Sequence, residues 1–180
     1  MRLPRLFRGN HHRLTLFWGL ALAGLLLPWL ASCEVPLMPG GKAARACVVN
    51  SIHDGDSLRV TCDGEHLKVR LHCLDAPELS QPPWGQESRD HLRRITPKQV
   101  VLVPKDKDRY GRTVGELLTA DASRASINLR MVTDGQAVVY PRYCNERRFY
   151  RAEQRAREER AGVWAKAGAQ QAPWAHPKPG

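Results

Sequence analysis

Between residues 45 and 120 the chain alternates apolar and polar positions in short runs, a period typical of β-strands that bury one face. In the third run Leu67, Val69 and Leu71 share one face, so that Arg70 points away from them. The alternation predicts five strands: ACVVNSI at 46–52, SLRVTC at 57–62, HLKVRLHCL at 66–74, QVVLVP at 99–104 and TVGELLTA at 113–120.

Turn and helix signals connect these strands. Asp54-Gly55 and Asp63-Gly64 are dipeptides that accommodate the positive φ angles of tight hairpin turns. Apolar residues at helical spacing and helix-end signals predict helices at 84–95, 126–135 and 146–161. Short strands in a meander, with helices before the fourth strand and after the fifth, predict a β-barrel plus α-helices. We expect a five-stranded barrel of the oligonucleotide/oligosaccharide-binding (OB) kind with about three helices.

The first 32 residues have the composition of an export signal. Residues 1–13 carry four arginines and no acid, and residues 14–31 are almost entirely apolar. The sequence Leu-Ala-Ser-Cys at 30–33 resembles the bacterial lipobox, in which the chain is cut before the cysteine and the sulfur receives a diacylglycerol. An uncleaved membrane anchor is the alternative, because the apolar run is nearly long enough to span a bilayer. Pro28 and the small residues after it favour cleavage before Cys33.

The rest of the chain divides into a linker, a domain and a tail. Residues 33–44 are rich in Pro and Gly without periodicity, so we expect a lipid-anchored flexible linker before one folded domain at 45–165. The Pro-rich tail at 166–180 is expected to be loose. This organisation predicts an exported lipoprotein of the cell envelope, on the periplasmic or extracellular face of a membrane. No segment indicates an obligate protein partner, and we expect a monomer.

Charge narrows the classes of partner. The chain has 180 residues, which excludes a large multidomain enzyme, and 42% apolar with 26% charged residues is typical of a globular protein. Its formal net charge is +10, and removal of residues 1–32, with four arginines and no acid, leaves +6. A basic chain favours a polyanionic partner, either nucleic acid or a phospholipid surface, and charge alone does not choose between them.

Cysteine usage agrees with export. If Cys33 of the five cysteines carries lipid, an even set of four remains for an oxidising compartment, where two disulfides can form. No Cys-x-x-Cys or His/Cys cluster indicates a zinc site. Four reduced thiols in the core are the alternative, because free cysteine buries well.

Three disulfide pairings of the four remaining cysteines exist in principle. If Asp54 and Gly55 are the central residues of a hairpin turn, Cys47 and Cys62 stand directly opposite each other. In that register they form a hydrogen-bonded pair, in which a disulfide is strained unless a bulge intervenes. Cys73 and Cys144 are then paired by elimination.

Two acidic segments are candidate metal-binding positions. Asp56 begins a predicted strand, where an acid is disfavoured unless it is needed. Asp75 lies where the third strand runs out into a turn, and Glu78 follows it as a candidate general base. Asp56 and Asp75 offer two carboxylates to a hard cation such as Ca²⁺ if the first and third strands lie side by side. Ordinary turn chemistry is the alternative for each segment taken alone.

The loop at 105–112 mixes cations with one aromatic residue. Arg109 and Arg112 carry planar donor forks that suit phosphate, and Tyr110 can contact a base or a terminal phosphate. The alternative for this loop is a solvated connection without a ligand.

Taken together, these segments resemble the staphylococcal nuclease (thermonuclease) family. The resemblance covers about residues 45–165 and rests on DGDSL at 54–58, VRLHCLDAPE at 69–78, DRYGR at 108–112 and AEQRAREERAGVW at 152–164. It implies a Ca²⁺-dependent phosphodiesterase on an OB barrel that cleaves DNA and RNA and leaves 3′-phosphates.

The resemblance also implies a role for each matching residue. Asp56 and Asp75 match the direct calcium ligands and Asp54 matches an acid near the metal. Ala76, where the family's nuclease has Thr, would contribute its backbone carbonyl. Two departures concern the short loop LSQPPWG after Glu78 and the later tyrosines, which align only loosely. The remaining matches are Arg70, Arg112 and Glu78 for catalysis, and Arg109, Tyr110, Tyr140 and Tyr143 for substrate binding.

Two other functions fit the fold and the charge. A catalytically inactive OB barrel could bind nucleic acid, and a basic lipoprotein could bind anionic envelope lipids. Asp56, Asp75 and Glu78 would repel phosphate unless a cation lies among them, so their joint presence favours the enzyme.

The lipobox predicts that Cys33→Ser abolishes lipidation and changes processing, because the thiol is the acceptor of the lipid. Intact-mass analysis of membrane-extracted protein measures this directly. The matched variant Cys47→Ser keeps the acceptor and should still be acylated. An unsubstituted chain without acyl mass on Cys33 would contradict the prediction.

Overall fold

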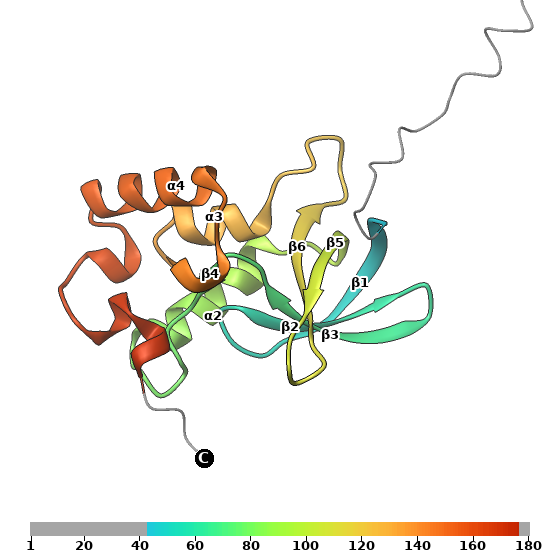
Figure 1. The fold of residues 1–180 in the computed structure, drawn as a ribbon, viewed down its shortest axis with the longest axis horizontal. Helices are drawn as coiled ribbons and strands as arrows, with labels where there is room; N and C mark the ends of the chain where they lie inside the picture. Colours follow the sequence, from blue (N-terminus) through green and yellow to red (C-terminus); the bar gives the residue numbers. More distant parts are fainter. Residues whose placement is uncertain (1–42, 177–180) are drawn as a thin grey trace, which may run out of the picture. The chain divides into compact units, whose positions relative to one another are not determined.

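The computed structural model describes residues 43–176, so the predicted signal peptide, Cys33 and all but the last two residues of the linker lie outside the described residues. Five strands close a barrel in the order β1-β2-β3-β6-β5, and three α-helices accompany it in this part of the chain, as the sequence predicts (Figure 1). The barrel strands are β1 (Arg45–Ile52), β2 (Ser57–Cys62), β3 (Glu65–Leu71), β5 (Gln99–Lys107) and β6 (Thr113–Thr119), and the helices are α2 (Trp84–Ile95), α3 (Ile127–Thr133) and α4 (Arg147–Glu158).

The barrel interior is filled by the apolar positions of the alternating pattern. Val60, Val69, Leu71, Leu102 and Leu117 are all at most 1% exposed. Neighbouring strands run antiparallel except β3 and β6, whose parallel pairing closes the barrel and aligns Arg70 with Val114. Closure removes the sheet edges that would otherwise pair with other chains.

The third predicted strand is interrupted, which the alternation of residues 66–74 does not indicate. Cys73 adopts a φ of +71°, and the chain turns there from β3 into the short strand β4 (Leu74–Asp75). β4 pairs with β7 (Val138–Val139) to form a separate two-stranded sheet. This break moves Asp75 off the barrel strand and onto a second sheet.

The two Asp-Gly turns differ from each other. Asp63 and Gly64 have φ values of +52° and +83°, so the second turn has the predicted conformation. The prediction for the first turn is wrong, because Gly55 is not among the glycines with positive φ and Ile52 pairs with Leu58 around a longer loop. A Cβ on Gly55 would lie 2.0 Å from the Ser88 hydroxyl, so glycine is required there by close packing against α2.

A bulge between Val49 and Ser51 shifts the register of β1 against β2 and restores the pairing of Cys47 with Cys62. The structure contains the Cys47–Cys62 disulfide and the Cys73–Cys144 disulfide, the pairing that we predicted from register and elimination. The second bond spans 71 residues and joins the β3–β4 break to the segment before α4.

The helices form one group beside the barrel (Figure 1). α3 packs against α4 and β6, and the predicted inward face of α4, with Phe149, Ala152 and Ala156, is buried. Ser126 caps the start of α3, and its side chain accepts a hydrogen bond from the Leu129 amide. In residues 43–176 we find no helix with the length and apolar character needed to cross a membrane.

The described part of the tail, up to His176, has regular turns, which the expectation of a loose segment did not include. It forms two 3₁₀ turns, Ala169–Gln171 and Pro173–Ala175, of which Gln170 and Pro173 are buried. The side-chain amide of Gln170 donates through Nε2 to the carbonyls of Val163 and Lys166, which fixes the first turn to the end of the domain. A polar anchor of this kind leaves no hydrophobic periodicity in the sequence, so the pattern did not reveal it.

Gly55→Ala is expected to lower the free energy of unfolding by about 2–3 kcal/mol, because the new methyl group overlaps Ser88 and Ala76. Gly64→Ala is the control. Gly64 has positive φ but no atom within 4 Å of a Cβ, so only backbone strain of about 1 kcal/mol is expected. Urea unfolding of both variants measures the difference, and equal losses would show that the contact at Gly55 is not tight.

Candidate active site

Arg70 holds together the two carboxylates that the sequence singles out. Its guanidinium contacts Asp56 through Nη1 and Asp75 through Nη2. Both carboxylates are buried, at 3% and 5% exposure. We expected the two carboxylates to meet if the first and third strands lay side by side. These strands are not neighbours, because β2 lies between β1 and β3. Asp56 instead precedes β2, and the pairing of Ser57 with Arg70 brings it to the guanidinium.

Asp56 is held from several directions. Its Oδ2 accepts a hydrogen bond from the Ala76 amide at 3.0 Å, and its Oδ1 accepts one from the Ser57 hydroxyl at 2.9 Å. The Asp54 carboxylate accepts from the Asp56 amide at 3.0 Å. These bonds join the loop before β2 to the segment after β4, so the position of the carboxylate is fixed by residues on both.

The electrostatics of this group favour a bound cation. Burial lowers the pKa of Arg70, but the Asp56 and Asp75 carboxylates raise it more, and the net shift is upward, so the guanidinium stays charged. Burial, followed by the charge of Asp56, raises the pKa of Asp54 to about 6. The Arg70 guanidinium thus supplies one positive charge against more than one buried carboxylate. Part of the negative charge therefore stays uncompensated. A hard oxygen-binding cation such as Ca²⁺ fits this donor set.

Asp108 organises the predicted phosphate loop between β5 and β6. Its Oδ1 accepts hydrogen bonds from the amides of Tyr110 and Arg112, each at 2.9 Å, and its Oδ2 accepts from Arg112 Nε at 2.7 Å. Gly111 completes the turn with a φ of +78°. The Arg112 side chain is therefore oriented by the loop that carries it.

Arg112 is connected to the carboxylate group. Its Nη1 donates to the Ser57 hydroxyl at 3.3 Å, and that hydroxyl donates to Asp56. The series Arg70–Asp56–Ser57–Arg112 thus links the two guanidinium groups through one carboxylate and one hydroxyl. Residues from β2, β3 and the β5–β6 loop converge here, as the sequence predicts for Arg70 and Arg112.

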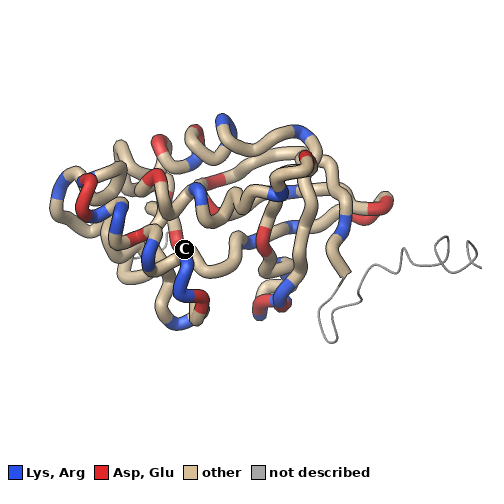
Figure 2. Tube along the Cα trace, turned by 90° about the horizontal axis from the view of Figure 1, so that it is seen from above, with Lys and Arg blue, Asp and Glu red and all other residues tan. Residues whose placement is uncertain are grey.

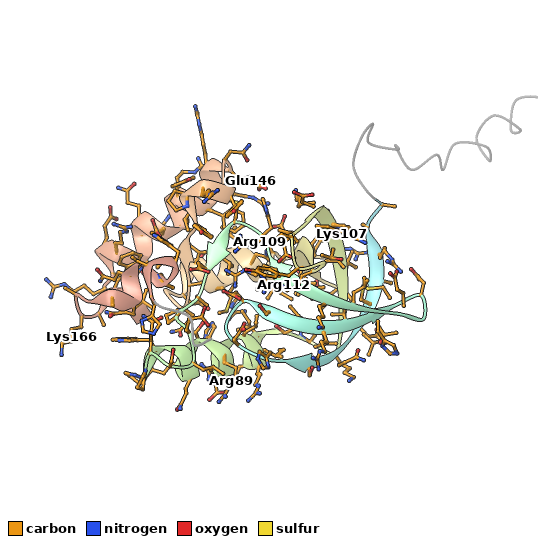
Figure 3. The ribbon with its side chains drawn as sticks, turned by 60° about the horizontal axis from the view of Figure 1, so that its bottom comes forward. Arg89, Lys107, Arg109, Arg112, Glu146 and Lys166 are labelled. Atoms are coloured by element: carbon orange, nitrogen blue, oxygen red, sulfur yellow. A yellow bond between two sulfur atoms is a disulfide. The ribbon has the colours of Figure 1, made fainter. Side chains whose placement is uncertain are left out.

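Arg109 and Tyr110 form a pair at the outer end of the same loop. Arg109 Nη2 donates to the Tyr110 hydroxyl at 2.6 Å, and its guanidinium lies 4.8 Å from the ring centroid. Tyr110 is 69% exposed. Figure 3 shows Arg109 and Arg112 on this loop and Arg89 apart from them on α2.

Glu78 lies on the segment between β4 and α2, three residues after Asp75. Its amide donates to Gln81 Oε1 at 2.9 Å, and its carbonyl accepts from the Gln81 amide at 2.8 Å. Gln81, itself buried, therefore holds the backbone that presents the glutamate. The short loop that departs from the family pattern is thus stabilised from within.

Tyr140 and Tyr143 lie together, with ring centroids 4.9 Å apart in an edge-to-face arrangement. The Tyr140 amide donates to the Cys73 carbonyl, which places this pair at one end of the β4–β7 sheet. Trp174 of the tail stacks on Tyr140, a contact that we did not expect from the sequence.

Comparison with known proteins places this geometry in a family. The staphylococcal nuclease homologue model matches residues 68–166. The chain is 34% identical over 163 residues to a protein named micrococcal nuclease from Shigella flexneri, covering 86% of this chain and 92% of that protein. It belongs to the staphylococcal nuclease family.

Two further relatives are similar to most of the chain. An uncharacterized endonuclease of Haemophilus influenzae is 39% identical over 143 residues, 78% of each chain. Protein ParB of Escherichia coli is 36% identical over 145 residues, covering 76% of this chain and 80% of that protein. The family match starts at residue 68, after Asp56, and the structure adds the contact of Asp56 with Arg70 to it.

Three residues that contribute contacts to the site were not singled out from the sequence. They are Ser57, Gln81 and Asp108. The spacing of Asp108 and Arg112 within DRYGR is a signal that could have found one of them, because side chains four apart across a tight loop can pair. Ser57 and Gln81 form contacts that depend on the packing of distant segments.

The charges of the domain do not form one continuous basic segment. Figure 2 shows Lys and Arg interspersed with Asp and Glu along the trace. Arg148 pairs with Glu116 and Glu146, and Arg157 pairs with Glu153. Basic and acidic groups are thus interleaved, and these two arginines are paired with acids.

Asp108→Ala is expected to raise amide hydrogen exchange at Tyr110 and Arg112 by about 10- to 100-fold, since both amides lose a charged acceptor. Asp106→Ala removes the same charge from the neighbouring end of β5, where the carboxylate accepts from the Lys107 amide, and should leave both rates unchanged.

The protection of the Tyr110 and Arg112 amides from hydrogen exchange should change with pH in one direction. Burial raises the pKa of Asp108, but its bonds with Arg112 lower it more, below the ordinary 3.8. The stabilisation is therefore complete above pH 3.8 and declines as the pH falls through the lower folded-state pKa. Protection that weakens with rising pH would contradict this role.

Proposed function

We propose that the protein is a Ca²⁺-dependent endonuclease that hydrolyses phosphodiester bonds of DNA and RNA and leaves 3′-phosphates. The observation that carries the proposal is the series Arg70–Asp56–Ser57–Arg112, which joins two guanidinium groups to a buried carboxylate. Its relatives include proteins named as a nuclease and as endonucleases. Membership of the family supports nuclease activity. The proposal adds the metal ion and the chemical form of the products.

Asp56 and Asp75 would hold the calcium ion through their carboxylates, and Ala76 through its backbone carbonyl. Asp54, hydrogen-bonded to the Asp56 amide, would keep that ligand in place. Bound Ca²⁺ would supply positive charge to the oxygens of the scissile phosphate. The residue at position 76 acts through its backbone, so the change from Thr to Ala does not remove a ligand.

Arg70 and Arg112 would bind the non-bridging oxygens of that phosphate. Each guanidinium has a planar fork of donors that matches two phosphate oxygens, and the charge on those oxygens grows in the five-coordinate transition state. Lysine offers a single point charge, so Arg→Lys at either position removes part of this stabilisation.

Glu78 would accept the proton of the attacking water, the role that suits a carboxylate three residues beyond Asp75 on a segment fixed by Gln81. Arg109 and Tyr110 would contact a neighbouring or terminal phosphate, because the pair is exposed on the loop that carries Arg112. Tyr140 and Tyr143 would belong to the substrate-binding surface.

We also propose that the protein is exported and anchored by lipid on Cys33, and that it acts as a monomer. Two disulfides within residues 43–176 support an oxidising compartment, since such bonds persist outside the cytosol. The mature chain would then present the nuclease domain on a tether at the cell envelope.

Incubation with single- and double-stranded DNA and RNA, in Ca²⁺ or in excess chelator, tests the reaction. Cleavage is expected only with Ca²⁺, and end analysis should find phosphate on the 3′ side. Full activity in chelator, or 5′-phosphate products, would contradict the proposal.

Site variants test the assigned roles. Glu78→Gln, Arg70→Ala and Arg112→Ala should each lower the rate by about 10²–10³-fold, because each removes a group that acts in the transition state. Arg89→Ala removes an arginine from α2, away from the site, and should retain activity (Figure 3). Thermal unfolding confirms that each variant is folded.

A further inference from the structure

Three aromatic side chains from two distant segments form a group that we call the aromatic stack: Tyr140, Tyr143 and Trp174. The centroids of the Trp174 and Tyr140 rings are 5.4 Å apart, and the angle between the ring planes is 4°. Tyr143 meets Tyr140 at 79°. Trp174 thus covers one face of Tyr140, so a nucleobase cannot use that face.

Tail residues before and after Trp174 are fixed by contacts with the domain. Before it, the buried Gln170 is bonded to the carbonyls of Val163 and Lys166, and Pro173 is buried. After it, His176 Nε2 lies 3.2 Å from the Ser80 hydroxyl. The indole is therefore carried on a fixed segment, and little conformational freedom remains to be lost when a ligand binds.

The aromatic stack is connected to the segment of the candidate metal ligand Asp75 and to the segment of the candidate base Glu78. The Tyr140 amide donates to Cys73, next to the strand in which Asp75 pairs with Val138. Ser80, the partner of His176, lies two residues after Glu78. Figure 1 shows the tail beside the loop that follows β4. The stack is thus joined to the two segments that carry Asp75 and Glu78.

The exposure of these rings is unusual for large apolar side chains. Trp174 is 39% exposed and Tyr143 is 58% exposed, although Trp174 has one face covered by Tyr140. Part of Trp174 outside its contact with Tyr140 is therefore accessible to solvent. The Arg142 guanidinium, 5.6 Å from the Tyr143 ring centroid, adds positive charge at the same place. Exposed aromatic faces beside a cation are the features that bind single-stranded nucleic acid.

We propose that Trp174 is a base-stacking residue that binds an unpaired nucleobase of the substrate strand, with Tyr140 as its rigid support and Tyr143 beside it. The proposal rests on the proposed nuclease function and extends it to the tail, which lies outside the family match at 68–166. Stacking needs an unpaired base, so this subsite favours single-stranded over double-stranded substrate. Tyr140 then acts through Trp174 and not by direct stacking on its covered face.

Binding without turnover tests the proposal. Fluorescence anisotropy of a labelled single-stranded oligonucleotide, in Ca²⁺ and in the Glu78→Gln background, measures the dissociation constant. Trp174→Ala should weaken binding about 5- to 100-fold, the usual effect of losing one base–aromatic stack. Trp174→Phe keeps a stacking face and should stay within about threefold. Binding of a duplex of the same sequence should change less.

Tyr150→Ala is the matched control, because Tyr150 is an aromatic residue of the same 39% exposure on α4, outside the stack. The affinity of the Tyr150→Ala variant for the oligonucleotide should equal that of the protein without this substitution. Unchanged affinity in Trp174→Ala would reject the stacking role. Tighter binding or faster hydrolysis in Trp174→Ala would also reject it, and would show that the tail obstructs the substrate.

Photocrosslinking of the unsubstituted chain keeps the proposal testable if Trp174→Ala does not fold. A single-stranded oligonucleotide with 5-iodouracil should crosslink to the peptide that contains Trp174, and crosslinks confined to other peptides would reject the role. The proposed function is tested separately by hydrolysis in the unsubstituted chain. Intact hydrolysis with no Trp174 effect rejects only the stacking, and absent hydrolysis rejects the enzyme.

Discussion

The contact of Arg70 with Asp56 and Asp75 is the interaction on which the site depends. A buried guanidinium is costly unless carboxylates face it, and a buried carboxylate has the same requirement in reverse. Each group therefore fixes the position of a different segment: the loop before β2, strand β3 and strand β4. The barrel supplies the register that brings Asp56 to Arg70, and the turn at Cys73 supplies the direction that brings Asp75 there.

The features that the sequence predicts well are those with local causes. Alternation of apolar residues gave the five strands, because a strand with one buried face needs that period whatever lies around it. The turn at Asp63-Gly64 is exposed, so its conformation depends only on the two residues that form it. The types of residue in the site were equally visible, because Arg and Asp in short motifs are required by phosphate and cation chemistry.

The features that the sequence does not predict have causes far along the chain. Gly55 follows the same dipeptide pattern as Gly64, but Ser88 of α2 determines what fits there. Nothing in residues 66–74 indicates that β3 ends at Leu71, because the partner of the next segment is β7. Likewise, Trp174 is an isolated aromatic in a Pro-rich tail until the fold places Tyr140 against it.

The Cys73–Cys144 bond makes completion of the carboxylate site depend on the time and place of synthesis. It ties the start of β4 to a residue 71 positions later, so neither a chain still leaving the ribosome nor one in a reducing cytosol has this tie. Until the bond forms, the segment of Asp75 lacks this support, and its strand is only two residues long. A nuclease exported as we propose would thus be least well assembled while it is still in the cytosol.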